Sequence, residues 1–288
     1  MSKKKIFLFD IASDAGCLEQ GTEQSPTHFR VNGFAENLRQ SAFEVHDLGG
    51  VSIPILDRHN RPPVRNFPSP QIVWEKTRAF LAAPEKIENG DTFICLGGDC
   101  SITVGTVAAM ADRYGAESLH VVYLDGDTDS IVPNPENCVG AAGMGLYFLT
   151  NASEYWSGCR LLPSQITVIG NKEEVTQDSL ATISLQKLRA EGITRSIESM
   201  LKGIPKDRHL IVHFDVDVLS KDEMPAAYSP REAGLTLSEV ENILKLVFAD
   251  QRVVFFELTE FVPSKDQNGQ YAKSITQAIV GALSQRKA

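Results

Sequence analysis

Continuous apolar runs constrain the fold of this chain more than any other feature of its sequence. Seven short runs are rich in β-branched and aromatic residues: KIFLFDI, FEVHDL, TFICLGG, HVVYLD, QITVIG, HLIVHFDVDVL and RVVFFELTEF. Most are apolar throughout, which is typical of strands covered on both faces. Because parallel strands need long connections that are usually helical, the sequence predicts a three-layer α/β/α fold with a mainly parallel sheet.

Helical patterns lie between several of these runs. Thr236 and Glu239 form a capping-box signature. An apolar helical face follows it, at Leu237, Val240, Ile243, Leu244 and Val247. A similar face near the C-terminus is formed by Ile275, Ile279, Ala282 and Leu283. The Pro- and Arg-rich stretch 56–70 lacks periodicity and is interpreted as a long surface loop, so we expect a single domain over residues 1–288.

Composition excludes several classes of function. The formal net charge of −9 argues against a nucleic-acid partner, which needs clustered Lys and Arg. No apolar stretch approaches the roughly 20 residues of a membrane span, so we expect no membrane partner. The five cysteines are odd in number and form no pair of CxxC sites, which indicates a reduced, cytoplasmic protein rather than a disulfide framework.

Polar residues follow three of the predicted strands. Asp99 and Cys100 follow a pair of glycines in CLGGDCS. The other two sets alternate along the chain: Asp125, Asp127 and Asp129 in LDGDTD, and His213, Asp215 and Asp217 in HFDVDV. Period-two geometry would put each alternating set on one face. Ligands of parallel sheets gather at the carboxyl ends of strands, where these residues are expected to meet.

Five clustered carboxylates are costly without cations, since like charges within a few ångströms cannot all stay ionised. Divalent metal is the simplest remedy: oxygen ligands suit Mg, Ca or Mn, whereas a Cys100 thiolate favours Zn. Two ions about 3.5 to 4 Å apart would generate a hydroxide nucleophile. In the alternative interpretation, the aspartates are turn and helix-cap residues, Cys100 is an inert buried thiol and His213 a core histidine.

These residues resemble motifs of the ureohydrolase family, which comprises arginase, agmatinase and formiminoglutamase. GGDCS is similar to the family's GGDHS, LDGDTD to DAHxD, FDVDVL to FDxDxxD, and FELTEFVPSKD to DxVEVNPxxD. MPAAYSPREAGLT matches in length a segment that usually reads APGTGTPxPGGLT. The resemblance covers nearly the whole chain and implies a sheet of about eight strands.

The resemblance also implies a ligand set for two Mn ions, with Zn or a single ion as alternatives. Asp125 and Asp215 would bridge the ions. Cys100 and Asp129 would complete one site, and Asp127 and Asp217 the other. Cys100 and Asp127 stand where the family has histidines, and both side chains can still bind metal.

Other departures fall on the catalytic groups of the family. Ala142 aligns with its proton-shuttling histidine, which leaves that role vacant. Glu260 matches the glutamate that contacts the guanidinium group, and together with Asp127 it is a candidate catalytic residue. Tyr228 is expected to project into the substrate space, although a surface tyrosine is the alternative. Asp99 and His213 are expected to support the ligands, and His213 to supply an imidazole to the metal or a ligand.

The function implied by the resemblance is metal-dependent hydrolysis of a C–N bond in a guanidino or amidino compound. A hydroxide held by the ions would attack the guanidinium carbon while Glu260 orients the cation. The main alternative is a catalytically silent member with a binding, regulatory or structural role; deacylation at a single ion is a third, based on fold analogy alone. The family also implies a homo-oligomer. Arginine is a doubtful substrate because SIVPNPENCVGAAG lacks the family's pattern for the amino acid end.

Overall fold

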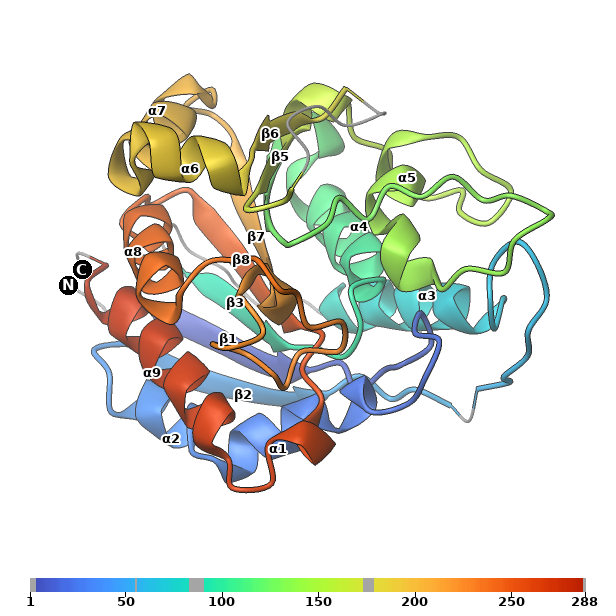
Figure 1. Cartoon of the computed structure of the whole chain (residues 1–288), viewed down its shortest axis with the longest axis horizontal. Helices are drawn as coiled ribbons and strands as arrows, with labels where there is room; N and C mark the ends of the chain where they lie inside the picture. Colours follow the sequence, from blue (N-terminus) through green and yellow to red (C-terminus); the bar gives the residue numbers. More distant parts are fainter. Residues whose placement is uncertain (1–3, 55, 83–90, 173–178, 287–288) are drawn as a thin grey trace.

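A parallel sheet of eight strands runs through the molecule in the order β2-β1-β3-β8-β7-β4-β5-β6 (Figure 1). The computed structural model describes residues 4–54, 56–82, 91–172 and 179–286. The strands are β1 Lys5–Asp10, β2 Glu44–Gly50, β3 Thr92–Leu96, β4 Leu119–Leu124, β5 Ile166–Ile169, β6 Ala181–Ile183, β7 His209–Asp215 and β8 Val253–Thr259. The predicted parallel sheet is thus confirmed.

Helices cover both faces of this sheet. One face packs against α1 Ser25–Val31, α2 Phe34–Arg39, α6 Leu185–Glu191, α7 Ile193–Gly203, α8 Leu237–Phe248 and α9 Gln270–Ser284. The other face packs against α3 Ser69–Leu81, α4 Ile102–Tyr114 and α5 Gly145–Thr150. Figure 1 shows the two groups on opposite sides of the strands, which gives the expected three layers. None of the described helices is both long and apolar enough to cross a lipid bilayer.

Alternating side chains of the strands pack into two separate hydrophobic cores, one on each face of the sheet. In β1, Ile6 and Leu8 belong to the core under α8 and α9, whereas Phe7 and Phe9 belong to the core under α3 and α4. Both sets are buried, which explains why the central strands read as continuous apolar runs. The two predicted amphipathic helices are confirmed as α8 and α9, and Thr236 and Glu239 form the reciprocal capping box of α8.

Three details differ from the sequence-based expectations. β6 was not predicted, because it has only three residues and lies at the sheet edge, where a strand leaves no continuous apolar run. The stretch 56–70 is mostly irregular, but Val64 within it is buried and forms a β-bridge with Val139. The runs around β4 and β7 end as strands at Leu124 and Asp215, so the acidic residues that follow lie in turns.

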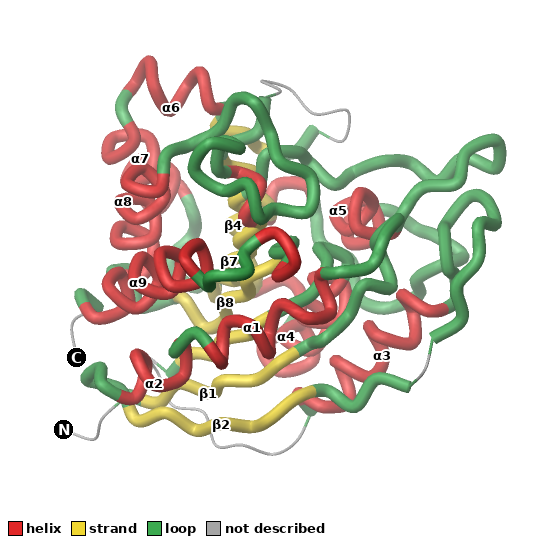
Figure 2. Tube along the Cα trace, turned by 60° about the horizontal axis from the view of Figure 1, so that its bottom comes forward, coloured by secondary structure: helices red, strands yellow, loops and turns green. Residues whose placement is uncertain are grey.

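The loops that carry these acidic residues meet at one edge of the sheet. Because all eight strands are parallel, the carboxyl ends of neighbouring strands β3, β8, β7 and β4 lie side by side. Loop segments cluster around the end of the sheet where β4, β7 and β8 are labelled (Figure 2). The polar residues predicted to converge therefore do so.

Candidate metal and substrate site

A pocket of about 230 Å³ opens at this edge of the sheet. Its wall combines the turns after β3, β4, β7 and β8 with the segment that follows β1 and the loop that precedes α5. The polar side chains in the wall are Cys17, Cys100, Asp127, Asp129, Asp215, Asp217, Tyr228, Ser229, Arg231 and Glu260. Most of the predicted site residues thus face one cavity.

Cys100 lies at the floor of the pocket, in the turn between β3 and α4. Its Sγ lies 3.0 Å from Asp215 Oδ2 and 3.3 Å from His213 Nε2. The turn packs so closely on the chain that a Cβ at Gly98 would lie 1.7 Å from the Ser13 carbonyl oxygen, which explains the glycine there. Cys100 is therefore held against the acidic turns and is not an isolated core thiol.

His213 is fully buried and its two ring nitrogens have different partners. Nδ1 lies 2.7 Å from Glu257 Oε1, and Thr106 Oγ1 donates to Glu257 Oε2 at 2.8 Å. In the tautomer whose Nδ1 donates to the Glu257 carboxylate, the Nε2 lone pair points to Cys100. The Tyr123 ring stacks on the imidazole, with centroids 4.0 Å apart. A histidine fixed in this way by a buried carboxylate is the usual arrangement of a metal ligand.

Asp125 and Asp215 each end a strand by capping the turn that follows. Asp125 Oδ1 accepts from the Asp127 N–H, and Asp215 Oδ1 from the Asp217 N–H, both at 2.6 Å. These two aspartates therefore have the turn-capping contacts of the alternative interpretation. These contacts use only one oxygen of each, however, and the buried Asp125 Oδ2 has no hydrogen-bond partner.

The expectation that each alternating set shares one face of a strand holds for His213 and Asp215, which both lie in β7, but is wrong for Asp127, Asp129 and Asp217. Asp217 lies in the 3₁₀ turn Val216–Val218, beyond the end of β7. Asp129 has a left-handed backbone with φ of 43°, and its Oδ2 accepts from the Tyr123 hydroxyl at 2.7 Å. The Asp127 side chain is 50% exposed, whereas that of Asp217 is 6% exposed. Turn geometry rather than pleating brings these carboxylates together.

The acidic cluster divides into two parts. We call Cys100, Asp125, Asp129, His213 and Asp215 the thiol half, and Asp127, Asp217 and Arg231 the arginine half. In the arginine half, the Arg231 guanidinium donates from Nε to Asp217 Oδ2 at 3.1 Å and from a terminal nitrogen to Asp127. In the thiol half, no lysine or arginine of the described chain forms an ion pair with a carboxylate.

Burial and mutual repulsion perturb the acids of the thiol half. Burial, reinforced by the charges of neighbouring aspartates, raises the pKa of Asp125 and that of Asp215 well above the usual range. Burial raises the pKa of Asp129 to about 7, although the Tyr123 hydroxyl opposes the shift. Burial and Asp215 raise the pKa of the Cys100 thiol. Without a cation, this half binds protons instead.

The donor atoms fit a divalent ion. One atom each from Cys100, Asp125 and His213 lie within 4.8 Å of one another, as do oxygens of Asp125, Asp215 and Asp217. Sulfur, nitrogen and oxygen donors suit Zn, Mn or related ions. The unpartnered Asp125 Oδ2 supplies a free lone pair where an ion would be held.

Glu260 closes the pocket floor beside the thiol half. It has a left-handed backbone with φ of 62°, its Oε1 accepts from the Cys100 N–H at 2.7 Å, and its N–H donates to the Gly98 carbonyl at 2.8 Å. Burial, together with Asp99, raises the pKa of Glu260 well above its usual range. A strained buried carboxylate facing a cavity is typical of functional sites.

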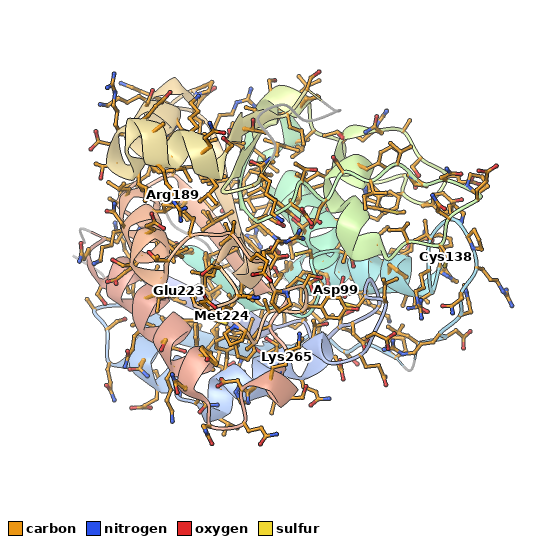
Figure 3. All side chains as sticks on the ribbon, viewed as in Figure 1. Asp99, Cys138, Arg189, Glu223, Met224 and Lys265 are labelled. Carbon is orange, nitrogen blue, oxygen red and sulfur yellow. The ribbon has the colours of Figure 1, made fainter. Side chains whose placement is uncertain are left out.

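The remaining predicted residues have distinct positions. The Tyr228 hydroxyl accepts from the Glu19 N–H at 2.7 Å, and its side chain lines the pocket with Ala142. Asp99 does not line the pocket; it accepts from the N–H groups of Gly16 and Ser101 and so ties the first loop to the Cys100 turn. Figure 3 shows Asp99 near the centre of the molecule and Cys138 far from it.

Three site residues were not predicted from the sequence. Tyr123 and Glu257 lie inside apolar strands, where an isolated polar residue is easily attributed to the core. Arg231 follows Pro230 in a segment without periodicity and contacts Asp127, which is 104 positions away in the chain. Two signals were available for Glu257: it is an acid in the middle of an apolar strand, and it aligns with the first Asp of the family motif DxVEVNPxxD. No local signal marked Arg231.

The sequence of this chain is similar to those of known proteins of one family. The Arginase family model matches residues 4–284. The arginase of Bacillus caldovelox is 25% identical and that of Staphylococcus aureus (strain MRSA252) 27% identical, over 97% and 98% of this chain and 98% of each relative.

The solved structures agree on the fold. The Bacillus caldovelox arginase superposes with a TM-score of 0.86 at 23% identity, covering 99% of both chains. The Entamoeba histolytica arginase gives 0.87 at 19%, covering 98% of this chain and 99% of that one. The Bacillus subtilis formimidoylglutamase gives 0.76 at 18%, covering 98% and 87%. This chain belongs to the arginase family and has the fold of the family's hydrolases.

Proposed function

We propose that this protein is a divalent-metal-dependent hydrolase that cleaves a C–N bond of a guanidino or amidino compound. The observation that carries the proposal is the thiol half: buried thiol, imidazole and carboxylate donors converge at the floor of a pocket, and Asp125 Oδ2 is left without a partner. Membership of the arginase family supports the reaction class.

The ion would be held by Cys100, Asp125, Asp215 and His213, with Asp129 adjacent. A divalent ion in such a set supplies Lewis acidity and lowers the pKa of a water molecule toward neutrality. Glu257 fixes the His213 ring so that Nε2 faces the ion position. Metal analysis of the purified protein distinguishes Mn, Zn and other ions of this class.

Glu260 is the residue that we assign to the substrate cation. Its Oε1 accepts from the Cys100 N–H, whereas Oε2 has only a weak contact with Cys17 Sγ at 4.0 Å and would accept from a guanidinium or amidinium N–H. Tyr228 lies over the same cavity and limits its size. Ala142 lines the pocket and cannot transfer a proton, so we expect protonation of the leaving amine to limit turnover.

The test is a screen of metal-loaded protein against guanidino and amidino compounds, with release of urea, ammonia or the free amine as the readout. Hydrolysis that is lost in Glu260→Gln and in an Asp125→Asn/Asp215→Asn variant would support the proposal. A stoichiometrically loaded protein that binds these compounds without turnover would instead favour the catalytically silent alternative.

Two expectations from the sequence stay predictions. A cytoplasmic location follows from the cysteine pattern, and a homo-oligomer from the family. Fractionation of the source cells and analytical ultracentrifugation test them separately.

A further inference from the structure

The guanidinium of Arg231 occupies the arginine half of the acidic cluster. Nε donates to Asp217 Oδ2 at 3.1 Å, and a terminal nitrogen donates to Asp127. The Arg231 side chain is only 19% exposed. The guanidinium therefore forms ion pairs with the two carboxylates that would otherwise complete a second ion position.

The backbone around Arg231 fixes this arrangement. Arg231 forms a parallel β-bridge with Ser220, and its carbonyl accepts from the Lys221 N–H at 2.6 Å. The Asp217 carboxylate is held from the opposite side, where Oδ1 accepts from the Gly126 N–H at 3.1 Å. The ion pair is thus supported by main-chain contacts on both partners.

Gly126 makes room for the pair. A Cβ at this position would lie 2.8 Å from Asp217 Oδ1 and 3.3 Å from Arg231 Cδ. The first distance is shorter than real Cβ contacts, so a larger residue would push the carboxylate or the arginine away. The absence of a side chain at Gly126 therefore also favours the ion pair between Arg231 and Asp217.

The Arg231 guanidinium and a metal ion compete for the same position between Asp127 and Asp217. A guanidinium stays charged at any physiological pH, and it accepts no metal because it has no free lone pair. An ion between Asp127 and Asp217 would compete with Arg231 for the Oδ2 atoms of both carboxylates and would be repelled by its charge. Among the described residues, no lysine or arginine pairs with the thiol half in this way.

We propose that Arg231 is a built-in substitute for a second metal ion, so that the chain binds a single divalent ion, in the thiol half. This inference rests on the proposed function only in assuming that the thiol half binds metal. It extends that proposal by assigning the positive charge of the arginine half to Arg231 instead of to a metal ion.

The experiment compares wild type with Arg231→Gln, Arg231→Lys and, as a matched control outside the site, Arg78→Gln. Arg78 pairs with Asp112 on the surface. Each protein is loaded with Mn²⁺ alone, desalted and measured for metal per chain, and electron paramagnetic resonance reports whether the ions are isolated or coupled. We expect one isolated ion in wild type, Arg231→Lys and Arg78→Gln, and two coupled ions in Arg231→Gln, since paired ions lie about 3.5 to 4 Å apart.

Two outcomes would overturn the inference. Two coupled ions in wild type would show that Arg231 does not exclude the second one, and this result needs no variant to fold. One ion in a correctly folded Arg231→Gln would show that something else limits the number. Neither result affects the proposed hydrolase, whose failure appears separately as no turnover by protein with one bound ion. Absence of metal from every protein would overturn both.

Discussion

In the thiol half of the acidic cluster, buried carboxylates face one another, and no lysine or arginine of the described residues pairs with them. In the arginine half, the single positive charge of Arg231 is shared by two carboxylates. The acids of the thiol half have strongly raised pKa values. In the arginine half, burial raises the pKa of Asp217, but Arg231 opposes the shift. Clustered negative charge at this edge of the sheet is thus balanced in two ways: by an arginine in one half and, in our proposal, by a metal ion in the other.

The largest expected effect comes from removing the carboxylates of the thiol half. Asp125→Asn/Asp215→Asn removes two anionic ligands from the ion position, so we expect metal to be lost entirely on desalting. Elemental analysis measures this directly. Asp47→Asn, which alters a carboxylate paired with Arg30 away from the pocket, is the control and should retain full metal content. Equal metal in the double variant and the control would contradict the assignment.

A smaller effect is expected from the support of His213. Glu257→Gln leaves the shape but removes the charge that orients the imidazole, and such changes typically weaken metal binding by about 10 to 100-fold. His213→Ala should weaken it at least as much. Calorimetric titration with Mn²⁺ or Zn²⁺ gives the affinities. Unchanged metal content and affinity in His213→Ala would leave His213 as a core histidine only.

The pH dependence of stability should differ with and without metal. Asp129 is protonated up to about pH 7 in the folded chain, but only up to about pH 4 when unfolded. The folded state therefore binds more protons across this window, and its free energy of unfolding falls as the pH rises. The same sign holds for Asp125 and Asp215, whose pKa values are also raised.

We therefore expect the metal-free protein to melt at a lower temperature at about pH 8 than at about pH 5.5, and added Mn²⁺ to raise Tm more at the higher pH. Thermal melts in chelator and in Mn²⁺ measure the metal-free Tm and its increase on metal binding at each pH. Asp129→Asn should flatten the metal-free profile. A metal-free Tm that rises steadily up to pH 8 would refute this account of the thiol half.

The smallest effect is expected outside the cluster. Arg78 and Asp112 pair on the surface, where both side chains are more than 40% exposed, so Arg78→Gln should change stability by less than about 1 kcal/mol. Chemical denaturation measures it. A larger loss would indicate that exposed arginine pairs contribute more in this chain than we assume, which would complicate the use of Arg78→Gln as a control.

The sequence predicted the layers of the fold because burial on both faces leaves a strong local signal. Phe7 and Ile6 point into different cores, yet both had to be apolar. The short edge strand β6 left no such signal. The period-two rule failed for Asp127, Asp129 and Asp217, because the carboxylates of Asp125 and Asp215 cap turns that end the strands.

The candidate site was predicted in part for a related reason. Residues at strand ends, such as Cys100 and Asp215, can be placed together once the sheet is known to be parallel. Arg231 could not be placed, since its contact with Asp127 depends on how a long irregular segment folds back over the pocket. Glu257 was hidden for the opposite reason: it lies in the middle of a buried strand, where only its partner His213 reveals its role.

The most direct test of the central claim is the absorption spectrum of the protein loaded with Co²⁺, in wild type and in Cys100→Ser. A sulfur-to-cobalt charge-transfer band reports a thiolate bound to the ion. We predict this band in wild type and its loss in Cys100→Ser, because the ion is assigned to the thiol half. Bound Co²⁺ without the band in wild type, or a band that persists in Cys100→Ser, would contradict the account.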